Sequence, residues 1–112
     1  MKYAMLIHYK PGYYEALPED EQKAMFAEYR SLGEDPRARG GAQLQPVETA
    51  TTVRVQDGRT LTSDGPYADA KEVLGAYFVF ELDNLDEAIE LAARIPAARL
   101  GGAIEVRPLV ER

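Results

Sequence analysis

Two segments of this chain are apolar on both faces of the strands that they predict. In residues 2–9, alternate positions carry large apolar side chains, and the intervening positions are largely apolar as well. The segment 75–82 repeats this pattern with the run Gly-Ala-Tyr-Phe-Val-Phe-Glu-Leu. Because a strand with two apolar faces must be covered on both sides, we expect these segments to form the central pair of a sheet.

Two helices are predicted, one after each of these strands. Pro18 suits the first position of a helix, acidic residues follow it, and Gly33 marks the end of the helix. Asn84 is a good N-cap, and Glu87 completes a capping-box pattern for a second helix that Pro96 ends. The predicted apolar stripe of the second helix consists of Leu85, Ala88, Ile89, Ala92 and Ile95.

The remaining strands include a hairpin. Residues 51–56 and 59–63 alternate in polarity around Asp57-Gly58, which is a strong signal for a two-residue hairpin turn. Residues 42–46 predict a short strand, and residues 103–109 predict a last strand. A proline within the last strand favours a position at the edge of the sheet.

The order of these elements predicts the fold. Strand, helix, strand, inserted hairpin, strand, helix and strand follow one another in a single domain of residues 1–112. This is the order of an α+β, ferredoxin-like (split βαβ) fold with an inserted β-hairpin. Two helices can cover only one face of such a sheet, and the other face still carries large apolar residues. We therefore expect a homodimer in which two copies pack sheet against sheet.

Composition excludes several classes of function. Thirteen Lys and Arg against nineteen Asp and Glu give a net charge of −6, which disfavours binding to nucleic acid or to an anionic membrane. The chain has no cysteine, so disulfides, thiolate nucleophiles and cysteine-bound metals are excluded. No apolar run approaches the roughly 20 residues that span a bilayer. We expect a cytoplasmic protein without a metal site.

Two residues are candidates for acid–base chemistry. His8 is the single histidine, and it lies near the end of a predicted central strand. Histidine titrates near physiological pH and suits general acid–base catalysis, although it can also pack within a dimer core. Asp64 lies in the turn Asp64-Gly65-Pro66 and could orient His8 or act as a base. Alternatively, Asp64 caps its turn through backbone N–H groups.

Loop residues are candidates for substrate binding. Tyr13, Tyr14 and Tyr67 fall in predicted loops and could line a pocket. Lys71 lies in a charged loop with Asp69 and Glu72, where it could bind an acidic ligand or form a solvated salt bridge. The tyrosines that we assign to the core instead are Tyr3, Tyr29 and Tyr77.

The turn and the strand after it resemble a known family. The residues that carry the resemblance are Asp64-Gly65-Pro66-Tyr67 and Lys71-Glu72-Val73-Leu74-Gly75-Ala76-Tyr77. Together with the opening strand and the hairpin, they are similar to the DGPF branch of the YCII-related family over essentially the whole chain. Tyr67 replaces the usual Phe of the motif, and Ala76 replaces the second Gly of a Gly-Gly pair.

The resemblance implies a dimeric α+β barrel of ferredoxin-like subunits. In this family, a His-Asp pair is suggested to be catalytic, and one relative removes chloride from a hydroxylated aromatic ring. Asp64 matches the motif aspartate. We therefore expect a cofactor-independent enzyme that acts on a small organic, aromatic molecule through His8 and Asp64.

Two alternatives to an enzyme stay open. Members of the branch also occur beside or joined to sigma factors of the extracytoplasmic-function type, which implies a regulatory module with a sigma factor as partner. A ligand sensor that has a pocket but no chemistry is the other alternative.

Overall fold

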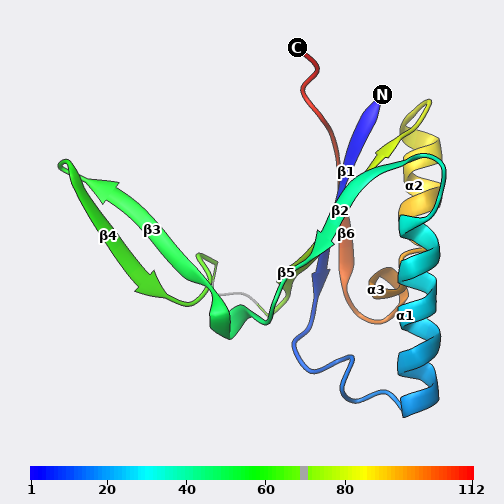
Figure 1. Cartoon of the computed structure of the whole chain (residues 1–112), viewed down its shortest axis with the longest axis horizontal. Coiled ribbons are helices and arrows are strands. Elements are labelled where there is room, and N and C mark those ends of the chain that lie inside the picture. The colour runs from blue at the N-terminus through cyan, green and yellow to red at the C-terminus, as the bar shows by residue number, and fades with distance from the viewer. Residues whose placement is uncertain (69–70) are drawn as a thin grey trace.

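The computed structural model of the protein describes residues 1–68 and 71–112. A four-stranded antiparallel sheet, in the order β2-β5-β1-β6, forms its centre (Figure 1). The four strands are β1 (Lys2–Tyr9), β2 (Ala38–Gln43), β5 (Val73–Glu81) and β6 (Ala103–Pro108). The predicted central pair, β1 and β5, and the predicted edge position of the last strand are confirmed.

The α-helices of the described residues lie on one side of this sheet, whereas the hairpin and the 3-10 turn before it lie on the other side (Figure 1). The α-helices are α1 (Glu19–Gly33), α2 (Leu85–Ala93) and α3 (Pro96–Arg99), and the 3-10 turn is η1 (Val47–Thr49). The hairpin consists of β3 (Thr51–Gln56) and β4 (Arg59–Asp64), inserted between β2 and β5. This order and topology confirm the ferredoxin-like subunit with an inserted hairpin, whereas the homodimer stays a prediction.

Side chains between the sheet and the helices form the core. On β1, Tyr3, Met5 and Ile7 are buried, and they alternate with half-buried residues that face away from the helices. Phe80 on β5 is fully buried against this cluster, as is Ile95 after α2. Burial of each large apolar side chain stabilises the fold by about 1.5–3 kcal/mol, so this side of the sheet accounts for much of the stability.

The two long helices begin differently. Asn84 caps α2 as predicted, because its side chain accepts a hydrogen bond from the Glu87 backbone N–H at 2.9 Å. At α1, the prediction of Pro18 as the first helical residue is wrong, since Pro18 has extended backbone (ψ 151°) and occupies the N-cap position. The apolar stripe of α2 is also narrower than predicted. Leu85 and Ile89 are exposed, and Leu91 is buried instead.

The face of the sheet without helices keeps several apolar side chains at its surface. Tyr77 was expected in the core, but 39% of its surface is exposed. It lies opposite Leu6 on the helix-free face, where no element of the described chain covers it fully. The second edge strand also differs from its prediction. Residues 42–46 were expected, but β2 starts at Ala38, because Gly40 and Gly41 pair with β5 and are not loop residues.

Candidate functional site

His8 lies at the end of β1, just after an irregularity in its pairing with β5. Ile7 pairs with Ala76, but His8 pairs with Leu74, so Gly75 is the extra residue of a bulge. The Tyr9 ring covers this glycine so closely that a Cβ there would lie 2.0 Å from Tyr9 Cε1. The bulge and the absence of a side chain at Gly75 together determine the position of His8 at the end of β1.

A carboxylate and a guanidinium continue the site from His8 on the helix-free face. His8 Nε2 lies 3.6 Å from Glu105 Oε1, and the His8 side chain is 30% exposed. On β6, Glu105 pairs with Leu6 and Arg107 pairs with Ala4, so both side chains share the face of His8. Arg107 Nε donates to the second carboxylate oxygen of Glu105.

His8, Glu105 and Arg107 form a row that can support acid–base chemistry. A carboxylate next to an imidazole can hold the ring in one orientation and stabilise its protonated form. Because Arg107 binds one oxygen of Glu105, the other oxygen stays directed toward His8. Sequence reasoning missed Glu105 and Arg107. Because Glu105 and Arg107 are two residues apart in the last strand, their side chains share one face. Only the register of this strand with β1 shows that His8 lies on the same face.

Asp64, the predicted partner of His8, is the last residue of β4 and is exposed. The turn after it is well anchored. Gly65 has φ +99° and donates from its backbone N–H to the Ala50 carbonyl at 2.8 Å, while the Thr52 hydroxyl donates to the Gly65 carbonyl at 2.9 Å. Among the described residues of one subunit, no hydrogen bond or ion pair joins Asp64 to His8, and their pairing stays a prediction.

The predicted binding residues are dispersed. The Tyr13 ring is half-buried, with its centroid 5.4 Å from that of Tyr9, next to the His8 end of β1. Tyr67 is 75% exposed, and its ring lies 4.9 Å from the guanidinium carbon of Arg54 on the hairpin. Tyr14 and Lys71 are exposed, and Asp69 lies outside the described residues. Of the predicted binding residues, Tyr13 is thus the one that packs next to the His8 end of β1.

Tyr9 and Tyr29 stay protonated at neutral pH. Burial and the neighbouring Glu15 carboxylate raise the pKa of Tyr9 above its usual value. Burial, together with the Tyr13 hydroxyl, raises the pKa of Tyr29 even further. Tyrosines of this kind can donate hydrogen bonds to a ligand, but they do not act as phenolate bases.

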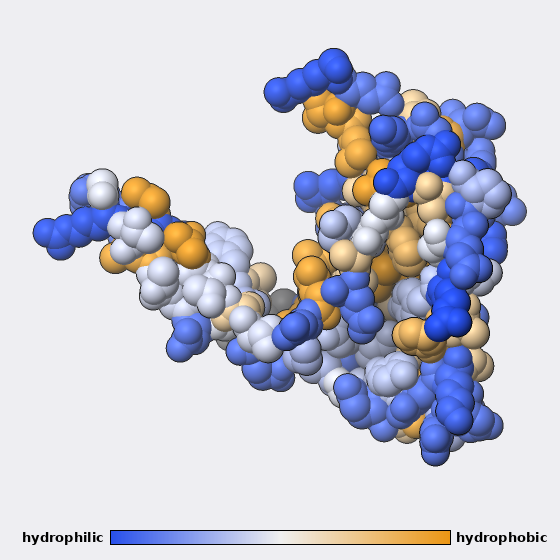
Figure 2. All heavy atoms as spheres, in the orientation of Figure 1, coloured by the Kyte–Doolittle hydropathy of each residue, from blue (hydrophilic) through white to orange (hydrophobic). Residues whose placement is uncertain are grey.

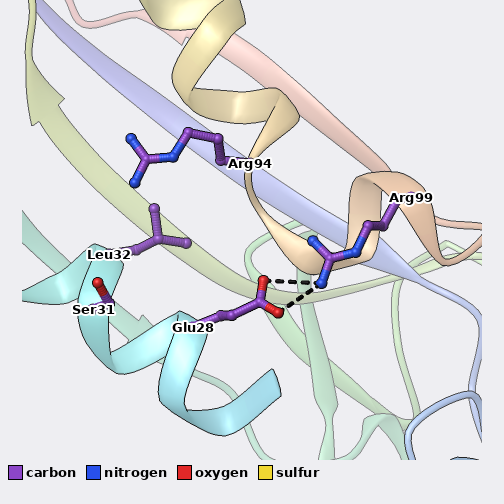
Figure 3. A pocket seen from close by; sticks show the side chains of 5 residues that line it. All are labelled: Glu28, Ser31, Leu32, Arg94 and Arg99. Carbon is purple, nitrogen blue, oxygen red and sulfur yellow. Dashed lines mark hydrogen bonds and ion pairs between the residues drawn. The ribbon is translucent and has the colours of Figure 1, made fainter. Parts of the chain in front are cut away.

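Two cavities lie on the helix side of the sheet, and no predicted site residue lines either one. A cavity of about 300 Å³ is lined by Glu28, Ser31, Leu32, Arg94 and Arg99. Arg99 reaches from α3 to both carboxylate oxygens of Glu28 at 2.8 and 2.9 Å, whereas Arg94 points to the other side of Leu32 (Figure 3). The arginines do not converge on a common point, and the Arg99–Glu28 pair ties α1 to α3.

The second cavity, of about 350 Å³, is apolar. Ile89, Ala92 and Ala93 of α2 line it together with Ile104 and Val106 of β6 and two further alanines. It has no charged or hydroxyl-bearing side chain that could fix the orientation of a polar ligand. Both cavities are therefore weaker candidates for chemistry than the helix-free face.

Within residues 1–68 and 71–112, no three His, Asp or Glu side chains gather closely enough to hold a metal ion. In the same ranges, the helices are too short or too polar to cross a bilayer.

Known proteins resemble this chain at three levels. The model of the YCII-related domain matches residues 1–112. An uncharacterized protein of Rhizobium meliloti (strain 1021) is 39% identical over 69 residues, which cover 61% of this chain and 56% of that protein. The match thus spans little more than half of the length of this relative.

The third resemblance is structural. The 5-chloro-2-hydroxyhydroquinone dehydrochlorinase TftG from Burkholderia phenoliruptrix AC1100, solved in complex with 2,5-dihydroxybenzoquinone, aligns with a TM-score of 0.56 at 18% identity. The alignment covers 100% of this chain and 96% of TftG. At this low identity, the likeness supports a shared fold and no shared activity.

Proposed function

The chain belongs to the YCII-related family, and we propose that it is the subunit of an enzyme that acts on a small aromatic molecule without a cofactor. His8 transfers the proton in this proposal. Glu105 holds the imidazole, and Asp64 is a second candidate carboxylate. The observation that carries the proposal is the half-buried imidazole 3.6 Å from a carboxylate on a partly apolar face.

The surroundings of His8 suit an aromatic substrate. Leu6, Leu74 and Tyr77 lie beside His8 on the same face and offer apolar surface to a flat ring. The polar row of His8, Glu105 and Arg107 borders this surface along β6. A ligand can therefore stack on apolar side chains while its hydroxyl groups contact the polar row.

The residues present support proton transfer as the main chemistry. An elimination, isomerisation or hydrolysis needs a base to take a proton and an acid to return it, and one imidazole can do both. The binding roles predicted for Tyr13, Tyr14, Tyr67 and Lys71 are part of the proposal. Tyr13 would contact the substrate from the loop after β1, and the other three would do so from more distant, exposed positions.

The test uses the two molecules named for the structural neighbour as probes. Binding of 2,5-dihydroxybenzoquinone is measured by calorimetric titration, and turnover by chloride release from 5-chloro-2-hydroxyhydroquinone. We expect His8→Gln to lower turnover about a hundredfold or more, which is typical for loss of a general acid–base group. Glu105→Gln should lower turnover less, and the exposed Glu90→Gln on α2 is the matched control.

The outcomes separate the roles of the residues. Equal turnover in wild type and His8→Gln would refute the mechanism. A loss in Asp64→Asn as large as that in His8→Gln would make Asp64 the principal partner. Binding of the quinone without chloride release from the chlorinated probe, or from related halogenated phenols, would favour the ligand sensor.

Membership of the DGPF branch and a cytoplasmic location stay predictions, as does the regulatory alternative. The relatives described above name no sigma factor, and no contact among the described residues favours a regulatory partner over a substrate. Co-purification of a sigma factor with the tagged protein would favour the regulatory hypothesis, especially if changes in the exposed loops abolished it.

A further inference from the structure

Arg107 is a basic residue of the helix-free face whose binding capacity is only partly used. Its Nε donates to Glu105, but in the part of the chain that the structure describes no hydrogen bond or ion pair involves its Nη1 or Nη2. The Arg107 side chain is 70% exposed. Because a guanidinium carries N–H donors on each of its nitrogens, the donors of both Nη atoms stay available to a ligand.

The backbone on either side of Arg107 is fixed in an extended form. Arg107 pairs with Ala4 on β1, and the Leu109 N–H donates to a carbonyl of β1 at 2.8 Å. Pro108 disfavours helical backbone at the residue before it, which is Arg107. Glu105 restrains the side chain through Nε. The guanidinium is therefore largely in place before a ligand arrives, which lowers the entropic cost of binding.

The surface next to Arg107 is apolar, and its nearest side chains are short. Ala4 lies beside Arg107 in the sheet, Val79 lies beside Ala4 on β5, and both are half-buried. At the next position of the same face, Leu6 lies beside Tyr77. Figure 2 shows hydrophobic and hydrophilic residues next to one another on the part of the body that faces the hairpin. A flat ring can lie on this surface with one edge toward the guanidinium.

The Glu105 carboxylate links the guanidinium to the imidazole of His8. Its Oε1 lies 3.6 Å from His8 Nε2, and its other oxygen accepts from Arg107 Nε. The two nitrogens therefore lie within about 9 Å of each other, on ordinary hydrogen-bond and carboxylate dimensions. A benzene ring with polar groups at opposite ends can reach both.

We propose that Arg107 binds the carboxylate of an aromatic acid, and that the substrate of this site belongs to that class. The planar fork of a guanidinium presents parallel N–H groups that match the two oxygens of a carboxylate. With the carboxylate at Arg107 and the ring over Ala4 and Leu6, the opposite end of the ring lies at His8. This inference deepens the proposed function and rests on it for the role of His8.

Charge favours this orientation of the ligand. The chain has a net charge of −6, so an anion needs a local cation to bind it. Arg107 supplies this cation at one end of the row. At the other end, the Glu105 carboxylate lies next to His8 and would repel an anionic group there. The charged end of an aromatic acid is therefore directed to Arg107, and an uncharged hydroxyl group is directed to His8.

The experiment is calorimetric titration of the full chain with two probes, 4-hydroxybenzoate and 4-hydroxybenzamide. The probes share the ring and the hydroxyl group, and they differ in the charge of one substituent. We expect wild type to bind the acid at least about tenfold more tightly than the amide, because hydrogen bonds between charged groups are stronger than those to neutral groups. Arg107→Gln should remove this preference and leave the affinity for the amide largely unchanged.

Two further variants make the result specific to Arg107. Arg94→Gln removes the same charge from an exposed arginine at the end of α2, and it should keep the preference for the acid. Arg107→Lys keeps the charge but loses the fork, so it should retain part of the preference. It replaces Arg107→Gln if circular dichroism shows that variant to be unfolded. In wild type, the acid should also shift the NMR signal of the His8 imidazole.

Several results would overturn the proposal. Wild type could bind the two probes equally, or bind neither at millimolar concentration. The preference for the acid could survive in Arg107→Gln, or disappear to the same extent in Arg94→Gln. The acid could also bind without moving the His8 signal.

The binding measurements do not depend on turnover, so the inference and the proposed function can fail separately. A preference for the acid that requires Arg107, without turnover of any probe, would refute only the proposed enzyme. Chloride release from 5-chloro-2-hydroxyhydroquinone, without a preference for the acid, would refute only the carboxylate site.

Discussion

The approach of β6 to β1 next to His8 allows a sharp test with Gly102→Ala. A Cβ at Gly102 would lie 2.2 Å from the His8 carbonyl oxygen and 3.0 Å from the Ala97 carbonyl oxygen. Ordinary van der Waals contact begins at 3.4 Å, so the methyl group is 1.2 Å too close to the first oxygen. Both obstacles are backbone atoms, which cannot rotate away as a side chain could. Strand β6 must therefore shift relative to β1.

We expect Gly102→Ala to lower the free energy of unfolding by about 1–3 kcal/mol, the range for overpacked sites. The same shift moves Glu105 relative to His8, because both lie on the strand pair that has to separate. Urea unfolding followed by circular dichroism measures the first effect. The NMR signal of the single imidazole measures the second. All samples are compared at one protein concentration, because self-association contributes to apparent stability.

Gly33→Ala is the matched control. Gly33 is the last residue of α1, and a Cβ there would meet its nearest atom, Phe78 Cε1, at an ordinary 3.9 Å. This change should leave stability within about 0.5 kcal/mol of wild type or raise it by up to about 1 kcal/mol. An unfolding midpoint and slope for Gly102→Ala equal to those of wild type would refute the proposed close packing of β6 against His8.

Three further predictions follow from other contacts. Gly75→Ala should destabilise the fold by about 1–3 kcal/mol, and most of this loss should disappear in a Tyr9→Ala background, because the ring causes the clash; a loss of equal size in both backgrounds would contradict this cause. Hydrogen bonds from Arg37 lower the pKa of Asp35 to about 2, so the stability from this pair is present above pH 4 and is lost as pH falls from about 4 to 2. Unfolding free energies measured over this range should fall less steeply in Arg37→Gln than in wild type. Parallel curves for the two proteins would show that Arg37 is not the cause of the lowered pKa of Asp35. Phe80→Ala should cost about 3–5 kcal/mol in urea unfolding, because the ring is fully buried, and a loss below 1 kcal/mol would be inconsistent with this packing.

Much of the fold could be predicted because its signals are local. The Asn84 cap and the Asp57-Gly58 turn each act within a few residues, and both form as predicted. Asp57 and Gly58 have φ values of +50° and +75°, which a type I′ turn requires. The apolar run of 75–82 identified a central strand for the same reason, since apolar residues on both faces of one segment indicate a central position in a sheet.

The errors concern features that depend on distant parts of the chain. Tyr77 looks like a core residue in sequence, yet it lies on the face that the helices do not cover. Leu85 and Ile89 match a helical stripe, but α2 packs through a narrower face. Local patterns show that a residue is apolar, and only the tertiary arrangement shows which partner covers it.

The candidate site was predictable only in part. His8 was identified as the single histidine on a central strand, and the structure places it on the helix-free face of the sheet. The neighbouring Glu105 depends on the register between β1 and β6, which are far apart in sequence. No local pattern encodes this register, so a motif residue, Asp64, was the candidate partner that sequence could offer.

The central claim is that the His8 imidazole and the Glu105 carboxylate form a pair on the helix-free face of the sheet. Because His8 is the single histidine, its acylation by diethyl pyrocarbonate can be followed by absorbance without assigning other sites. His8 should react several-fold more slowly in wild type than in Glu105→Ala, because the Glu105 carboxylate lies 3.6 Å from Nε2 and shields this ring nitrogen from the reagent. Equal rates of acylation in the two proteins would contradict the claim.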